Sequence, residues 1–276
     1  MTSVVIAAHN EAAVIDRCLA AVLEPGGETG LQVIVVANGC HDDTAAIARR
    51  RGVTVIERAE PGKAGALNAG DAVATSFPRI YLDADVVLSP GAVAALASAV
   101  GTSGALAAIP RRRMELVGRS WLVRAYYAIH SRLPAVVYGL YGRGAIAVSA
   151  PGRGRFVEFP DQMADDLFLD SLFAEHEKAL VDSAQVSVAA PMRVGDLVRR
   201  LARVRAGNTA MRATGTGIRP ARRMSWLTDV VLRAPWLAPA GVCYVAITVM
   251  AARRAGRLAR AGQVAWAHDR SSRVTA

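Results

Sequence analysis

One stretch of the chain decides the fold class: Arg79-Ile80-Tyr81-Leu82-Asp83-Ala84-Asp85-Val86-Val87-Leu88-Ser89-Pro90. Its first half is rich in strand-forming residues, and two aspartates follow with one residue between them. Ser89 is a good helix N-cap, and Pro90 suits the first position of the helix that we expect next. The two carboxylates are therefore predicted to lie at the C-terminal end of a buried strand, where open α/β sheets bind their ligands.

The spacing of the two aspartates bears on what they bind. Side chains of a strand alternate between faces, so Asp83 and Asp85 are expected on one side, about 7 Å apart. Two like charges repel each other unless a proton or a cation lies between them. Mg²⁺ and Mn²⁺ prefer oxygen ligands and commonly take one or two carboxylates together with substrate phosphates. Taken alone, the pair fits either such a metal site or a surface turn with two solvated carboxylates.

The composition narrows the class of protein. The chain has 276 residues, enough for one large core with an appended segment. Hydrophobic residues make up 53%, which predicts a globular protein that contacts a membrane. Three widely spaced cysteines exclude a disulfide framework and favour a reducing cytosol. The N-terminus has no basic segment followed by a long apolar run, so it is interpreted as a first strand rather than a signal peptide.

The net charge of +10 comes mostly from arginines in the second half of the chain. These arginines are not interleaved with exposed aromatic residues, as they would be in a protein that binds single-stranded nucleic acid. A basic surface facing acidic lipid, near an apolar segment, is the better interpretation. We therefore expect a membrane surface and no nucleic acid among the partners.

The first hundred residues repeat a unit of strand, polar turn and helix, which predicts a parallel sheet with right-handed crossovers. Strands are expected at residues 3–8, 32–37 and 53–57 and at the run from Arg79 into the two aspartates, with helices at 12–23 and from 44 to 51. The turns after these strands should meet at one edge of the sheet, where polar turns at helix N-termini and a lysine suit a phosphate. Each of their residues could equally shape a turn or cap a helix. The residues expected at this edge are Asn10, Glu11, Asn38, Asp42, Lys63, Asn68, Asp83 and Asp85.

From residue 104 onward the pattern changes. Strands are predicted at 104–109, 138–149 and 179–190, and an amphipathic helix at 119–133 with Trp121 on its apolar side. Residues 160–170 predict a helix with four carboxylates in its first turns. Acidic residues commonly complement the dipole of a helix start, although this explains the adjacent pair Asp165-Asp166 poorly. Residues 193–207 predict a basic helix suited to a diphosphate or to a lipid headgroup plane.

Near the C-terminus, residues 234–252 contain no charged side chain and are long enough to cross a bilayer. Two prolines crowd the start of this segment, and arginines follow it from Arg253 onward. The positive-inside rule would keep those arginines in the cytosol. Because the domain before the segment is also expected there, we predict a re-entrant or interfacial segment, with Trp226 and Trp236 at headgroup depth, in preference to a single crossing or a core helix.

Over roughly residues 1–207 the chain resembles the family 2 inverting glycosyltransferases of the GT-A fold. The resemblance is carried by Ala8-His9-Asn10-Glu11, Asn38-Gly39-Cys40-His41-Asp42-Asp43-Thr44, Gly62-Lys63-Ala64-Gly65-Ala66-Leu67-Asn68-Ala69-Gly70, Asp83-Ala84-Asp85 and Asp165-Asp166-Leu167-Phe168-Leu169. It implies a GT-A, Rossmann-like, mainly parallel sheet flanked by helices, to which the apolar segment at 234–252 adds a membrane-associating helical segment at the C-terminus. It also implies a nucleoside-diphosphate sugar donor and Mn²⁺ or Mg²⁺.

The resemblance also assigns roles to residues. Asp166 would be the catalytic base, with Asp165 beside it. The metal would be held by Asp85 and Asp83. The residues expected to bind the donor are His9, Asn10, Glu11, Asn38, Asp42, Lys63, Asn68 and Asp83. Asn38 stands where the family often has an aspartate that reads the nucleobase, so the donor base stays open. Asp165 replaces the usual glutamate. The proton acceptor is expected to face the metal-binding carboxylates.

These assignments predict a hexosyltransferase that moves sugar to an acceptor hydroxyl, possibly lipid-linked, at the inner face of the cell membrane. Residues 1–100 would form the nucleotide-sugar half, 101–192 the acceptor half, 193–252 the basic helix and apolar segment, and 253–276 a basic tail. Two alternatives stay open. A sugar nucleotidyltransferase would carry a glycine-rich basic loop after the first strand, which Ala8-His9-Asn10-Glu11 is not. A decayed binding protein for lipid or nucleic acid is disfavoured by the joint presence of Asp83, Asp85, Asp166 and Lys63.

Overall fold

The structure is a computed structural model and describes residues 1–24, 30–101, 104–161, 164–214, 218, 220 and 222–260. The part of the predicted basic tail beyond Arg260 lies outside these residues. The described chain forms two compact units. Unit 1 comprises residues 1–113, 142–161 and 172–188, and unit 2 comprises residues 114–141, 162–171 and the chain from 189 onward.

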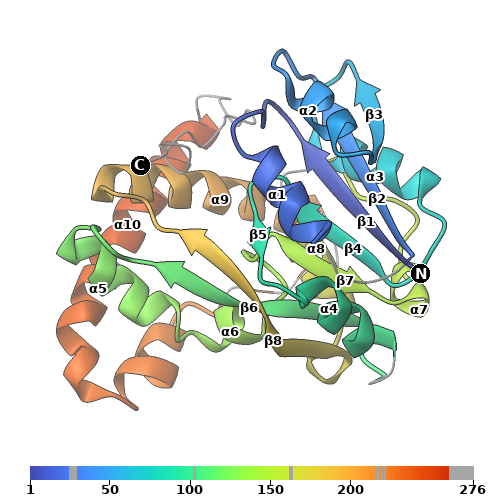
Figure 1. The fold of residues 1–276 in the computed structure, drawn as a ribbon. Coiled ribbons are helices and arrows are strands. Elements are labelled where there is room, and N and C mark those ends of the chain that lie inside the picture. The colour runs from blue at the N-terminus through green and yellow to red at the C-terminus, as the bar shows by residue number, and fades with distance from the viewer. Residues whose placement is uncertain are drawn as a thin grey trace. The chain divides into compact units, whose positions relative to one another are not determined.

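A mixed sheet of eight strands, in the order β3-β2-β1-β4-β7-β6-β8-β5, is the framework of unit 1 (Figure 1). Its strands are β1 (Thr2–Ala8), β2 (Leu31–Asn38), β3 (Thr54–Arg58), β4 (Arg79–Asp83), β5 (Val87–Leu88), β6 (Ala107–Glu115), β7 (Ala145–Val148) and β8 (Lys178–Ala189). The first four are parallel neighbours, as predicted. Strand β7 runs antiparallel to β4 and β6, and β5 runs antiparallel to β8, so the α/β fold is confirmed with a mixed sheet.

Helices cover both faces of the parallel strands, because the nearly continuous apolar runs of these strands place apolar side chains on both faces of the sheet. On one face, Val4 and Ile6 of β1 belong to a core shared with Ile15 of α1 and Leu96 of α4. On the other face, α3 lies so close that a Cβ on Gly70 would be 2.4 Å from a methyl group of Val5. The helices of unit 1 are α1 (Ile15–Val22), α2 (Thr44–Arg50), α3 (Lys63–Val73), α4 (Ala92–Gly101), α7 (Ala150–Arg153) and the 3-10 turn η1 (Glu175–Glu177).

Unit 2 is helical. Its elements are α5 (Trp121–His130), α6 (Pro134–Tyr138), most of α8 (Asp165–Leu172), α9 (Val194–Thr214), the π-helical turn η2 (Trp226–Val231), the 3-10 turn η3 (Pro235–Leu237) and α10 (Ala238–Arg260). Tyr126 and Tyr127 of α5, Leu197 of α9 and Ile247 of α10 form one buried cluster. A second cluster joins Ile129 of α5 to Val230 and Val231 of η2. These clusters fix α10 against α5 and η2.

Several predicted boundaries are wrong. Strand β4 ends at Asp83, and the Val86 N–H donates to the Asp83 carbonyl (3.1 Å), so Asp85 lies in a turn and the alternation expected for it does not apply. Helix α4 begins at Ala92, because Ser89 exchanges hydrogen bonds with Gln185 beside the β5–β8 pair. Trp121 is exposed.

Other differences concern the later elements. The predicted strand at 138–149 is instead the end of α6 followed by the shorter β7. The basic helix continues past residue 207 to Thr214, and Val204 of its predicted apolar stripe is half exposed. The helix does not end with the uncharged segment at residue 252. Helix α10 continues through the arginines to Arg260.

Candidate functional site

Three parallel strands of unit 1 end at the same level. In the register of the sheet, Ala8 of β1 lies opposite Ala37 of β2, and Ala7 lies opposite Asp83 of β4. The polar turns that follow β1, β2 and β4 therefore open at one edge, at the C-terminal ends of the strands, as predicted. This edge is the candidate site of unit 1.

Asn38 holds the turns of this edge together. Its side chain is fully buried, donates to the Ala8 carbonyl (2.8 Å) and accepts from the N–H of Gly62 (2.9 Å). The Asn38 carbonyl lies 2.5 Å from His9 Nδ1, and because a carbonyl only accepts, this nitrogen carries the proton. His9 Nε2 is then an acceptor, 3.4 Å from Asn10 Nδ2. The role of Asn38 in donor binding stays a prediction, and the structure shows it as the link between three loops.

The turns after β1 and β2 are also joined directly. The N–H of His41 donates to Asn10 Oδ1 (2.8 Å), and the N–H of Ala12 donates to Asp42 Oδ2 (3.0 Å). Burial opposes ionisation of Asp42, but hydrogen bonds from Thr44 and Ala12 outweigh it and lower the pKa of this carboxyl. The N–H of Glu11 donates to the Thr44 hydroxyl (2.8 Å). The two turns thus form one preorganised rim.

An ion pair at the rim joins α3 to β4. Lys63, the first residue of α3, places its Nζ 2.6 Å from Asp83 Oδ1, and both side chains are about a third exposed, at 29% and 37%. Gly144 lies against Asp83: it has φ 67°, and a Cβ there would be 2.9 Å from Asp83 Oδ2. Gly144 belongs to no motif that the sequence shows. Any side chain at this position would clash with the Asp83 carboxylate.

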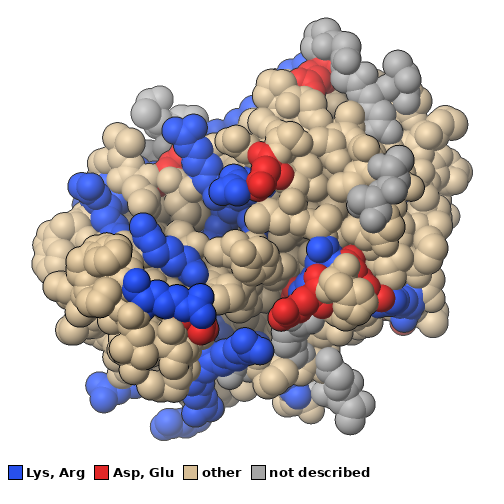
Figure 2. Space-filling model, turned by 90° about the horizontal axis from the view of Figure 1, so that it is seen from below, with Lys and Arg blue, Asp and Glu red and all other residues tan. Residues whose placement is uncertain are grey.

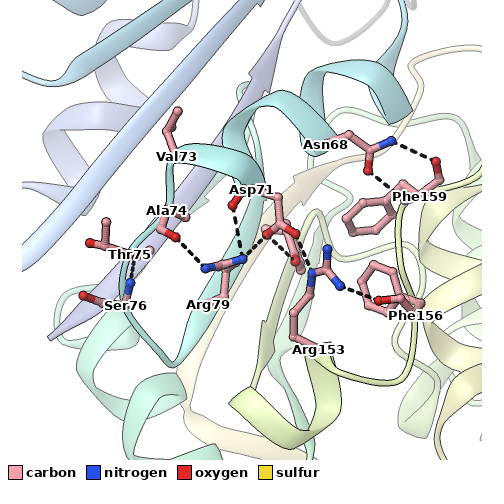
Figure 3. Close-up of polar contacts among 12 residues, drawn as sticks. Asn68, Asp71, Val73, Ala74, Thr75, Ser76, Arg79, Arg153, Phe156 and Phe159 are labelled. Atoms are coloured by element: carbon pink, nitrogen blue, oxygen red, sulfur yellow. Dashed lines mark hydrogen bonds and ion pairs between the residues drawn. The ribbon is translucent and has the colours of Figure 1, made fainter.

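Two further residues of α3 fix the segment 153–159. Asn68 donates to the Phe159 carbonyl (3.0 Å) and accepts from the Phe159 N–H (2.8 Å). One turn further on, Asp71 lies between the guanidinium groups of Arg79 and Arg153, at 2.5 Å from each (Figure 3). Asp71 was not predicted as a site residue. The sequence feature that points to a buried partner is an arginine, Arg79, at the start of a buried strand.

The predicted catalytic carboxylates belong to unit 2, where α8 begins at Asp165. Asp166 Oδ1 accepts from the N–H of Leu167 (2.8 Å), and the buried Asp170 accepts from the N–H of Leu140 (2.9 Å). Ala164, just before the helix, has φ 148°, a conformation that L-residues rarely adopt. Strain of this kind clusters at functional sites, and here it adjoins the Asp165-Asp166 pair.

Comparison with known proteins decides the family. The family model described as glycosyl transferase family 2 matches residues 3–144, which contain the whole rim of unit 1. The chain belongs to glycosyl transferase family 2. Curated relatives are uncharacterized glycosyltransferases of Mycobacterium bovis and Mycobacterium tuberculosis, each 30% identical over 119 residues. This match covers 43% of the chain, and the chain spans about half (51%) of the length of those relatives.

Solved structures share the family 2 fold. A mannosyltransferase from Pyrobaculum calidifontis in complex with GDP-Man and Mn²⁺ has a TM-score of 0.61 and 23% identity, over 95% of this chain and 79% of that one. Glucosyl-3-phosphoglycerate synthase from Mycobacterium tuberculosis, in complex with Mn²⁺, uridine-diphosphate-glucose and glycerol 3-phosphate, has a TM-score of 0.55 and 19% identity, over 78% and 81%. At these identities the likeness establishes the fold.

The end of β4 fits the divalent ion that family 2 implies. Among the described residues, no three His, Cys, Asp or Glu side chains are grouped to enclose a metal by themselves. Mg²⁺ and Mn²⁺ need only one or two carboxylates when substrate phosphates complete the shell. Burial, followed by the charges of Asp85 and Asp83, raises the pKa of the Cys18 thiol to about 12. Both carboxylates therefore add negative potential at this strand end, and the exposed Asp85 can meet a cation shared with a diphosphate.

Proposed function

We propose that this member of family 2 is a metal-dependent, inverting glycosyltransferase of the hexosyltransferase type. It would move a sugar from a nucleoside-diphosphate sugar to an acceptor hydroxyl. The observation that carries the proposal is the placement of Asp83 at the end of β4 and of Asp85 in the turn after it, at the edge where the turns after β1 and β2 also open. This edge is where nucleotide phosphates bind in open α/β sheets.

The donor would lie on the rim of unit 1. Polar turns there offer hydrogen-bond partners for base and ribose, and Lys63 supplies a positive charge for the diphosphate. Because Lys63 already pairs with Asp83, a bound diphosphate would share this lysine with the carboxylate. Mn²⁺ or Mg²⁺, held by Asp85 and Asp83, would neutralise the charge that grows on the leaving phosphate. The solved relatives carry GDP-Man or uridine-diphosphate-glucose, so the donor base is left open.

In the proposed step, the acceptor oxygen attacks the anomeric carbon from the side opposite the nucleoside diphosphate. The bond from the anomeric carbon to the phosphate oxygen breaks, and the anomeric configuration inverts. Asp166 accepts the proton of the attacking hydroxyl, which is general-base catalysis. Asp165 lies beside it at the helix start, where the dipole favours ionised carboxylates.

We also propose that the chain works at the inner face of the cell membrane on a lipid-linked or membrane-proximal acceptor. Two features support this: the excess of arginine in the second half, and the helix from Pro235 to Arg260. By length and composition alone, that helix could cross a membrane.

The first test uses a panel of sugar nucleotides with Mn²⁺ and measures release of nucleoside diphosphate. Asp166→Asn should lower turnover by about 10² to 10⁴ while the donor still binds, the usual contribution of a general base. Asp196→Asn is a matched control, because Asp196 also lies in the first turn of a helix but outside the proposed machinery. Unchanged turnover in Asp166→Asn would remove Asp166 from the mechanism, and release of pyrophosphate would point to a nucleotidyltransferase.

The second test concerns the metal. Asp85→Ala should abolish the dependence of donor binding on Mn²⁺, measured by calorimetry with and without the ion. If wild-type protein binds the donor with the same affinity in both conditions, the metal site at the end of β4 is wrong.

A further inference from the structure

Helix α10 packs with one face only. Gly241, Ile247, Ala251 and Ala255 are buried, and Tyr244 stacks on Tyr126 of α5 with ring centroids 5.1 Å apart. A Cβ on Gly241 would be 3.1 Å from Val231 and 3.2 Å from Trp226. This face is therefore fixed within unit 2 by α5, α9 and η2.

The opposite face of α10 is apolar and exposed. Val242 is 70% exposed, and Val249 and Met250 are also exposed. Positions 242, 246, 249, 250 and 253 recur at the helical spacing, so they lie on one side. Just before the helix, Trp236 is 77% exposed and Leu232 is 66% exposed. Only 17% of the most apolar 18-residue window of this helix is buried, and patches of this kind mark interaction surfaces.

Arginines continue the same exposed side. Arg253, Arg257 and Arg260 follow at spacings of four and three residues, and Arg254 is exposed beside them. The chain carries a net charge of +10, and Lys and Arg side chains are spread over the face shown in Figure 2 with fewer Asp and Glu among them. An apolar helix face that continues into arginines matches the order of acyl chains and anionic headgroups at a lipid surface.

We propose that α10 lies in the plane of an anionic lipid bilayer, with Val242, Val249 and Met250 in the acyl boundary and the arginines among the phosphates. A helix that crosses the bilayer alone would face lipid on all sides, whereas α10 has one side covered by α5 and η2. Trp236 suits headgroup depth. The inference deepens the membrane part of the proposed function, but lipid binding by this face does not require catalysis.

The test is co-sedimentation of the full chain with vesicles of phosphatidylglycerol and phosphatidylcholine, compared with phosphatidylcholine alone. We expect binding to the anionic vesicles that weakens with salt. Arg253→Gln should lower affinity about fivefold, because one arginine near an anionic surface contributes about 1 kcal/mol. Val242→Asp should lose binding, and Val157→Asp, a change at an exposed valine of unit 1, should keep it. Alkaline carbonate should release the bound protein.

Several results would overturn the inference. One is that Val242→Asp binds vesicles as tightly as wild-type protein, and another is that wild-type protein binds neutral and anionic vesicles equally. Resistance to carbonate would indicate a spanning helix. A dimer that Val242→Asp dissociates would assign the face to a second copy. Sugar-nucleotide hydrolysis by the same samples separates the two proposals. If Val242→Asp loses vesicle binding but keeps hydrolysis, both stand. If wild-type protein binds vesicles and hydrolyses no sugar nucleotide in the panel, the lipid surface stands and the proposed function fails.

Discussion

Helix α3 and strand β4 carry an ion pair at each end, and the two pairs differ in burial. At the start of β4, Asp71 is almost fully buried between Arg79 and Arg153. At the end of β4, Lys63 pairs with Asp83, and both side chains are about a third exposed. One helix–strand unit can therefore stabilise the fold at one edge of the sheet and offer exchangeable charges at the other.

The partners of the two aspartates explain this difference. Asp71 Oδ1 accepts from Arg79 and from the Tyr81 hydroxyl (2.9 Å), and Oδ2 accepts from Arg153. Burial raises the pKa of Tyr81, and the neighbouring Asp71 raises it further, so this hydroxyl remains a proton donor. Only 4% of the Asp71 side chain is exposed. Asp83 keeps over a third of its side chain in solvent, where a diphosphate can compete for Lys63.

The largest effect is expected from Asp71→Asn. This variant leaves two guanidinium groups buried without their countercharge, and breaking a buried ion pair typically costs about 3–5 kcal/mol. Chemical denaturation should show this loss in the free energy of unfolding. Asp16→Asn is the control, because its pair with Arg51 is exposed and such pairs contribute about 1 kcal/mol or less. Equal losses in the two variants would show that the buried pairs of Asp71 stabilise the fold no more than an exposed ion pair.

A smaller loss is expected from Asn68→Ala, which removes both hydrogen bonds to Phe159. Each such bond contributes about 1 kcal/mol, so we expect a loss of about 1–3 kcal/mol. Asn68→Asp keeps only the bond from the Phe159 N–H and should fall between wild type and Asn68→Ala. The donor KM tests the role that the family resemblance assigns to Asn68. If it rises in Asn68→Ala while stability is unchanged, Asn68 contacts the donor and does not act mainly as an anchor for segment 153–159.

The rim of unit 1 could be predicted from sequence because its signals are local. Alternating or continuous apolar runs give β1, β2 and β4, and the polar turns after them must open at one edge once the strands are parallel. The position of Asp85 could not be predicted in the same way. Strand β4 ends where the N–H of Asp83 bonds the Gly144 carbonyl (2.7 Å), a pairing that local patterns do not contain.

Long-range partners also explain the other misses. Asp71, Arg79 and Arg153 form one network, but 82 residues separate Asp71 from Arg153, and neither belongs to a motif. Ser89 satisfied every local rule for a helix cap, yet its N–H donates to the Gln185 carbonyl and its hydroxyl accepts from the Gln185 N–H. Tertiary pairing overrode local preference at each of these positions.

Lys63→Met tests the accessible end of the comparison. Because the pair is partly exposed, its loss should change the free energy of unfolding by no more than about 1 kcal/mol. Donor binding should weaken, since the methionine keeps the length of the side chain and loses its charge. Donor affinity and denaturation measured on the same sample give both results. A large loss of stability with normal donor affinity would make Lys63–Asp83 a structural pair like that of Asp71.

The smallest effect is expected at an ion pair that belongs to neither end. Glu177 Oε1 lies 2.5 Å from Arg155, and the Ala174 N–H donates to Oε2 (2.8 Å). The hydrogen bond from Arg155, followed by the one from Ala174, lowers the pKa of Glu177 from 4.5 to about 2. A depressed pKa in the folded state means that the stabilisation is complete above pH 4.5 and is lost as the pH falls toward 2. Glu177→Gln cannot titrate, so its Tm should fall less than that of wild type between pH 5 and pH 3 at the same ionic strength. Equal falls would show that this pair does not stabilise the fold.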